Sequence, residues 1–163
     1  MNATDLQKVP GFLFIDHVAI SVKQGDLEKQ VAAYKLMGFT EIHREDVHGK
    51  DLVREVLLRI GDGPNLIQLL EPLSPESPVA KQIEKNGGRG GFSHIALRVA
   101  DIRKAFDYLK QHGFNILDAA PRPGSRGTTV FFLHPKTTEA AALGYLVEVV
   151  QEGLMPCGKS FHA

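Results

Sequence analysis

The heptapeptide DHVAISV at residues 16–22 returns as SHIALRV at residues 93–99. Each copy is a largely apolar run with a histidine at its second position, His17 in the first and His94 in the second. A helix-like pattern follows each copy and ends at a Gly-Phe pair. Self-similarity of this kind indicates a duplicated structural unit. One histidine in each copy further suggests a site that the two copies share.

The residues between these landmarks predict the same order of elements, β-α-β-β-β, in each copy. Apolar alternation predicts strands, and helical spacing of apolar residues after an aspartate predicts each helix. In the first copy the expected strands cover residues 12–22, 39–42, 52–60 and 66–70, and the helix runs from an N-cap at Asp26 to Gly38. In the second copy they cover residues 92–99, 115–118, 128–133 and 145–150, and the helix runs from an N-cap at Asp101 through Lys110.

Four polar side chains occupy equivalent strands of the two copies. Alternation places His17 and His94 on one face of the first strand in each copy, and Gln68 and Glu148 lie in the last strands. Two imidazoles, one carboxylate and one amide oxygen suit a divalent first-row metal ion with positions left open for a substrate. The alternative to a metal site is that the two histidines are structural and hydrogen-bonded, that the Gln68 amide bonds to the backbone, and that the Glu148 carboxylate pairs with an arginine.

This order of elements predicts an α+β fold made of two paired β-α-β-β-β modules. Each module is too small to bury a sheet face alone, so we expect a curved, incompletely closed β-barrel around a metal site, with the helices outside. We expect one domain over residues 12–152, with a first module at 12–72, a connector at 73–91 and a second module at 92–152. An irregular segment at 1–11 and a tail at 153–163 flank it.

Composition narrows the class of protein. The chain has 163 residues, of which 43% are hydrophobic, and 19 basic against 19 acidic side chains, which fits a globular domain. The balanced charge gives no support to a nucleic-acid or membrane-surface role, and no apolar run is long enough to cross a bilayer. Cys157 is the only cysteine and has no internal disulfide partner, which is typical of a reducing compartment. The N-terminal residues are polar and do not resemble a signal peptide. We therefore expect a cytoplasmic protein.

Several segments between residues 15 and 150 resemble the methylmalonyl-CoA epimerases of the vicinal-oxygen-chelate superfamily, which also contains glyoxalases, bleomycin resistance proteins and dioxygenases. These segments are IDHVAI at 15–20, QLLEPL at 68–73, SPVAK at 77–81, HIA at 94–96, PRPG at 121–124, FLHPK at 132–136 and LVE at 146–148. The resemblance implies paired modules, a homodimer and one divalent ion per site, with Co2+ expected first and Mn2+, Zn2+ or Ni2+ as alternatives. It also implies that His17, Gln68, His94 and Glu148 are the metal ligands.

The reaction of this family moves a proton off and back onto the carbon between a thioester and a carboxylate, and so interconverts (R)- and (S)-methylmalonyl-CoA. Chelation of two substrate oxygens stabilises the enolate, and inversion by two bases needs proton carriers on opposite faces of it. Glu148 is one candidate base. Glu55 is the other, because VREVLL at 53–58 resembles the epimerase strand that carries a second catalytic glutamate. Alternation lets only one of Arg54 and Glu55 point inward, and the alternative for Glu55 is an exposed strand charge.

Three basic residues near glycines, Arg122, Arg126 and Lys136, are candidates for binding CoA phosphates or a substrate carboxylate. Solvated loop charges are the alternative. The expected partner is thus a small acyl-CoA substrate. Residues 45–51 lack a Gln-Gly pair common in the family, and residues 137–143 form a longer, alanine-rich segment. Because of these departures, a related substrate such as ethylmalonyl-CoA is an alternative to methylmalonyl-CoA.

The same ligands allow other functions. His17, His94 and Glu148 alone form a two-histidine, one-carboxylate set that could hold iron(II) for a dioxygenase, although Gln68 as a fourth ligand would close a position that oxygen needs. A glyoxalase I-like lyase uses a similar metal site. A non-catalytic small-molecule-binding protein of the superfamily would lack the ligands. We therefore expect an isomerase, with these three classes as alternatives.

Overall fold

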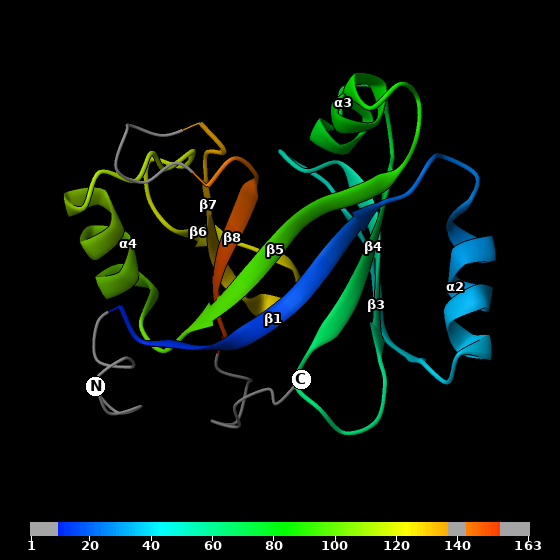
Figure 1. Cartoon of the computed structure of the whole chain (residues 1–163), viewed down its shortest axis with the longest axis horizontal. Coiled ribbons are helices and arrows are strands. Elements are labelled where there is room, and N and C mark those ends of the chain that lie inside the picture. Colours follow the sequence, from blue (N-terminus) through cyan, green and yellow to red (C-terminus); the bar gives the residue numbers. More distant parts are fainter. Residues whose placement is uncertain (1–9, 137–142, 154–163) are drawn as a thin grey trace. The chain divides into compact units, whose positions relative to one another are not determined.

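The computed structural model describes residues 10–136 and 143–153 (Figure 1). Its first elements are β1 (Phe12–Ser21), α2 (Leu27–Leu36), β2 (Thr40–Val47), β3 (Val53–Arg59), β4 (Leu66–Pro72) and the connector helix α3 (Pro78–Lys85). Then follow β5 (Gly91–Val99), α4 (Ile102–Gln111), β6 (Arg122–Pro123), the 3-10 helix η1 (Ser125–Gly127), β7 (Thr129–Leu133) and β8 (Leu146–Gln151). The order β-α-β-β-β occurs twice, as predicted, and the α+β class is confirmed. None of the helices in the described part of the chain has the length and apolar character needed to span a bilayer.

The chain forms two compact units. One consists of His17–Ser93 and is called the 17–93 unit. The other, called the 94–153 unit, comprises the described residues from His94 onward together with residues 10–16, which include the start of β1.

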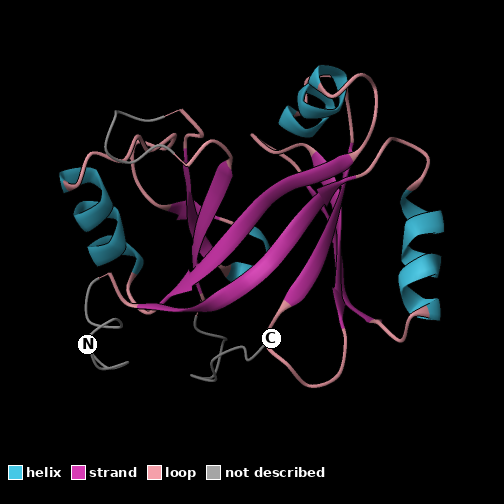
Figure 2. Ribbon diagram, in the orientation of Figure 1, coloured by secondary structure: helices cyan, strands magenta, loops and turns pink. Residues whose placement is uncertain are grey.

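In the 17–93 unit the strands are ordered β2-β3-β4-β1. β1 runs parallel to β4, whereas β2, β3 and β4 are antiparallel neighbours. On one sheet face α2 packs Leu27 and Val31 against Val56 and Leu69 (Figure 2). The short helix α3 packs through Val79 on the other face. His17, Glu55 and Gln68 project from this second face.

In the 94–153 unit the strands are ordered β5-β8-β7-β6. β5 runs parallel to β8, and β8, β7 and β6 are antiparallel neighbours. α4 buries Phe106 and Leu109 against Phe131 and Val149 of the sheet (Figure 2). The rings of Phe106 and Phe131 meet edge to face at 5.2 Å, a favourable geometry for two aromatic rings.

Residues 115–118, predicted as a strand, do not form one. Only Ile116 makes an isolated bridge to the sheet. The Asp118 carboxylate accepts hydrogen bonds from the Phe132 backbone N–H at 2.8 Å and from Arg122 Nε at 2.9 Å. A side chain therefore takes the place of a backbone carbonyl, and the strand ladder ends there. The short strand β6 pairs with β7 instead.

The helix α2 begins without its predicted aspartate cap. Asp26 makes no side-chain capping hydrogen bond. Instead the Glu71 carboxylate of β4 accepts the backbone N–H groups of Gly25 at 3.0 Å and Leu27 at 3.2 Å. In α4 the predicted cap is confirmed, because the Asp101 side chain accepts a backbone N–H of the first turn.

Candidate metal centre and proton-transfer residues

Glu55 and Gln68 are neighbours on β3 and β4 of the 17–93 unit. The register pairs Glu55 with Leu70 and Leu57 with Gln68, so both polar side chains project from the same sheet face. Glu55 is 3% exposed and Gln68 is 5% exposed. Gln68 Nε2 donates to Glu55 Oε2 at 2.8 Å. The amide group therefore fixes one oxygen of a buried carboxyl group.

Arg54, the residue before Glu55, lies on the other side of the strand. Its Nε and NH2 donate to the two oxygens of Asp46 at 2.7 and 2.9 Å, at the exposed surface. The hydrogen bond from Arg54 holds the pKa of Asp46 below its usual value. Successive strand residues face opposite sides, and in this strand the glutamate is the one that is buried.

His17 projects from the same face as Gln68. It lies on β1 and is 2% exposed. The parallel register pairs Ala19 of β1 with Gln68 of β4, and His17 shares a face with Ala19 because alternate strand residues do. An imidazole and an amide group therefore project from adjacent strands of the 17–93 unit.

The side-chain oxygen of Gln68 is the most informative atom of this face. Among the described residues, Gln68 Oε1 is buried and has no hydrogen-bond partner. Leaving such an acceptor unsatisfied costs about 1–3 kcal/mol, and a buried orphan atom calls for an explanation such as a bound ion. Amide oxygens are established ligands of divalent cations. Gln68 therefore fits the role of a metal ligand.

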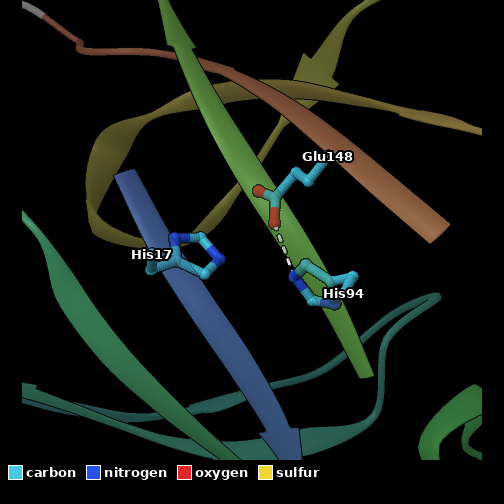
Figure 3. Close-up of side chains that lie close together, drawn as sticks. All are labelled: His17, His94 and Glu148. Atoms are coloured by element: carbon cyan, nitrogen blue, oxygen red, sulfur yellow. Dashed lines mark hydrogen bonds and ion pairs between the residues drawn. The ribbon is translucent and has the colours of Figure 1, made fainter. Parts of the chain in front are cut away.

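His94 and Glu148 meet in the 94–153 unit. His94 Nε2 and Glu148 Oε2 share a hydrogen bond of 2.9 Å between β5 and β8, and Figure 3 shows the two side chains directed at each other. The register pairs Ala96 with Glu148. The His94 ring also contacts Phe132 edge to face, at 5.3 Å between centroids. Both polar side chains are buried, so the histidine and the carboxyl group satisfy each other.

His17, His94 and Glu148 form a group that could hold a metal ion (Figure 3). With the Gln68 oxygen, the available donors are two imidazole nitrogens, one carboxylate oxygen and one amide oxygen. This mixture suits a divalent first-row ion, for which imidazole and carboxylate are preferred ligands.

Comparison with known proteins places the chain in a family. The family model of the Glyoxalase/Bleomycin resistance protein/Dioxygenase superfamily matches residues 16–132. The chain belongs to this superfamily. It is 39% identical over 142 residues to the ethylmalonyl-CoA/methylmalonyl-CoA epimerase of Cereibacter sphaeroides, a match that covers 84% of this chain and 96% of that relative.

Solved structures extend the relationship. A variant of the Streptomyces coelicolor methylmalonyl-CoA epimerase in complex with 2-nitronate-propionyl-CoA is 35% identical, with a TM-score of 0.74 over 86% of this chain and 97% of that one. A methylmalonyl-CoA epimerase in complex with methylmalonyl-CoA and NH4+ is 34% identical, with a TM-score of 0.75 over 92% of this chain and 99% of that one. The resemblance found in the sequence is confirmed, and this superfamily member is an isomerase of the epimerase type.

In this epimerase-family chain Arg126 is not a solvated loop charge. Its side chain is 4% exposed, and Arg126 NH2 donates to Asp16 Oδ2 at 3.0 Å. Arg98 donates to Asp16 Oδ1 through its NH2 at 2.6 Å and through its Nε at 2.9 Å. Arg126 also has a left-handed backbone, with φ of 57°, which is uncommon outside glycine. The Asp16 carboxylate thus binds two buried guanidinium groups next to His17.

The other two predicted substrate-binding residues have different surroundings. Arg122 donates to Asp118 at 2.9 Å and its guanidinium lies 5.6 Å from the centroid of the Phe132 ring. Phe132 in turn contacts the His94 ring. Lys136 is exposed. Cys157 and most of the long segment at 137–143 lie outside the described residues.

Two residues beside Glu55, His43 and Glu45, were not predicted as candidate site residues by the sequence analysis. His43 has its Nε2 2.9 Å from Glu45 Oε1 and 3.7 Å from Glu55 Oε1. Its side chain is 28% exposed, against 3% for Glu55. The position of His43 depends on an irregularity in the β2–β3 ladder, for which the sequence carries no signal.

Proposed function

We propose that this isomerase interconverts (R)- and (S)-methylmalonyl-CoA, or a close 2-alkylmalonyl-CoA, by metal-dependent proton transfer at the α carbon. One observation carries the proposal. Each unit contains one buried carboxyl group hydrogen-bonded to a side chain of metal-ligand type, Glu55 to Gln68 and Glu148 to His94. Inversion of a stereocentre through two bases needs two proton carriers, and these two carboxyl groups can fill that role. The relatives that act on methylmalonyl-CoA and ethylmalonyl-CoA support the substrate class.

We assign His17, Gln68, His94 and Glu148 as the ligands of one divalent ion per chain, Co2+ before Mn2+, Zn2+ or Ni2+. Such an ion, when bound, polarises the thioester and carboxylate oxygens of a substrate and stabilises the negative charge of the enolate. The buried, unsatisfied Gln68 Oε1 supports this assignment, because ligation would satisfy it.

The two carboxyl groups then divide the proton transfer. For one epimer Glu55 takes the α proton and Glu148 returns a proton to the opposite face. For the other epimer the roles reverse. Gln68 Nε2 donates to Glu55 Oε2 at 2.8 Å and so holds the orientation of the carboxyl group that takes the proton. Burial keeps both groups away from competing water.

The remaining assignments concern the substrate and the assembly. We propose that Arg122, Arg126 and Lys136 bind the substrate carboxylate or the CoA phosphates, since guanidinium and ammonium groups suit both anions. We also propose that the protein is a homodimer, as the family resemblance implies.

The deciding experiment measures deuterium incorporation from heavy water at the α carbon. Methylmalonyl-CoA and ethylmalonyl-CoA are incubated with the metal-loaded protein, and succinyl-CoA, which lacks the carbon between two carbonyl groups, serves as the control. We expect deuterium exchange and interconversion of the two epimers in one or both malonyl thioesters, and no exchange in succinyl-CoA. Absence of exchange in both malonyl thioesters overturns the proposal. So does protein that binds no ion after soaking in cobalt, zinc or manganese.

One competing function starts from a specific observation, the set of His17, His94 and Glu148. This set alone could hold iron(II) for a dioxygenase. The buried amide oxygen of Gln68 argues against it, because a fourth protein ligand occupies a position that oxygen needs. Oxygen consumption with the iron(II)-loaded protein and a catechol tests this alternative. A glyoxalase I-like lyase is tested with the hemithioacetal of methylglyoxal and glutathione.

A further inference from the structure

Glu55 faces a second carboxyl group across the β2–β3 ladder. The register pairs Glu45 directly with Glu55. Like charges at directly opposite positions of an antiparallel pair are destabilising. His43 lies between them, with its Nε2 2.9 Å from Glu45 Oε1 and 3.7 Å from Glu55 Oε1. A single imidazole nitrogen can therefore address either carboxyl group after a small rotation of the ring.

A bulge places His43 at this position. The ladder pairs Glu41 with Leu58 but His43 with Leu57, so the register shifts by one residue between them. Without the shift, His43 would pair with Val56, whose side chain packs toward α2. A one-residue shift exchanges the two faces of a strand, and bulges near active sites often redirect a side chain in this way. Here the shift brings His43 onto the face of Glu55.

A two-base reaction creates a need for such a group. After each turnover in one direction, one carboxyl group holds the abstracted proton and the other has lost its own. Both must return to their starting states before the same direction can proceed again. Glu55 is 3% exposed, whereas the side chains of His43 and Glu45 are 28% and 35% exposed. The buried base therefore has partly exposed proton carriers beside it.

We propose that His43 exchanges the proton of Glu55 with water between turnovers. When His43 is the neutral tautomer that carries its hydrogen on Nδ1, the proton on Glu55 Oε1 passes to the lone pair of Nε2, which gives a carboxylate and an imidazolium. The imidazolium then passes the proton from Nε2 to water or to Glu45 Oε1 and returns to neutral imidazole. The reverse sequence reloads Glu55. His43 is thus a proton-exchange residue that acts through Glu55, and the inference rests on the proposed function.

The test compares the first turnover with the steady state in His43→Gln. Epimerically pure methylmalonyl-CoA is mixed rapidly with metal-loaded protein, and conversion is followed from each of the two epimers. We expect a burst of one equivalent per site at the wild-type rate, followed by a steady-state rate lower by on the order of 100-fold. Added imidazole should restore the steady-state rate and leave the burst unchanged. His48→Gln, which alters an exposed histidine after β2, should behave as wild type.

Other outcomes overturn the inference. An unchanged steady-state rate in His43→Gln does so, and so does a lower rate without a burst or without rescue by imidazole, because that pattern reflects a structural role. His43→Asn provides a second variant should His43→Gln fail to fold. If wild-type protein does not exchange the α proton at all, the proposed function fails instead, so the two failures are distinguishable.

Discussion

Glu55 and Glu148 are both buried, but their hydrogen-bond partners differ. Glu148 bonds to the His94 imidazole, which we assign as a metal ligand, whereas Glu55 bonds to the amide nitrogen of Gln68. Glu148 is therefore assigned both as ligand and as base, and Glu55 as base alone. We expect Glu55→Gln and Glu148→Gln each to lower kcat by about 100- to 10,000-fold, the usual contribution of a general acid–base group. Only Glu148→Gln should also reduce the metal content after dialysis, as measured by elemental analysis.

Glu84→Gln is the matched control, because Glu84 is an exposed glutamate on α3. It should retain both activity and metal. Full activity in Glu55→Gln would remove Glu55 from the mechanism, and full metal retention in Glu148→Gln would remove Glu148 from the ligand set.

Asp16 is the second residue on which much depends. Its carboxylate is fully buried and accepts hydrogen bonds from Arg98 and Arg126. Breaking a buried ion pair leaves a charge without compensation and costs about 3–5 kcal/mol. We expect Asp16→Asn to lower the free energy of unfolding by this amount, measured by urea denaturation. Asp46→Asn, which breaks an exposed pair, should leave the midpoint unchanged. Equal midpoints for the two variants would contradict this account.

The sequence predicted whether a side chain is buried only where the alternation of residues along a strand determines its face. Burial of His17 and Glu55 follows from strand alternation together with the family resemblance. Burial of Arg126 does not follow from the local sequence, because its partner Asp16 lies 110 residues away. The turn that contains Arg126 also has two glycines, which are typical of a surface loop. His43 escaped detection for a similar reason, since its face depends on a bulge.

At the scale of elements, α2 shows how a helix start can be satisfied from a distance. Glu71 on β4 accepts the backbone N–H groups of Gly25 and Leu27, a role that local sequence assigns to Asp26. We expect Glu71→Ala to destabilise the fold by about 1–2 kcal/mol, the range of a lost helix cap, in thermal or urea unfolding. Asp26→Ala should have little effect. A larger loss from Asp26→Ala than from Glu71→Ala would show that the local cap dominates in solution.

Most elements were predictable because each carries its own periodicity and turn residues. The predicted strand at residues 66–70 appears as β4, which ends two residues later, at Pro72. The failure at residues 115–118 has a physical cause, because the Asp118 carboxylate captures the Phe132 N–H that a further strand would have used. Competition of this kind depends on a side chain meeting a strand that follows later in the chain.

For the whole molecule, the duplication predicted the order of the elements but not their pairing. The parallel pairs β1–β4 and β5–β8 join strands separated by a helix and two further strands in each copy. No local pattern specifies such a pairing, and the family resemblance supplies it. The ligand residues that we assign come from the first and last strands of both copies, so ion binding requires the folded state of both.

Metal binding should therefore stabilise the chain. An ion that binds only the native state adds about 2.7 kcal/mol to the free energy of unfolding when its free concentration is about 100 times Kd. We expect Co2+ to raise the Tm of chelator-treated protein, measured by differential scanning calorimetry.

Gln68→Ala should reduce this shift and His94→Ala should abolish it, because each removes a ligand. His48→Ala should retain the full shift, since it changes an exposed histidine outside the ligand set. A cobalt-induced shift of equal size in His94→Ala would place the ion elsewhere. The same measurement separates the role of the ligands in binding from their role in the reaction, because it requires no turnover.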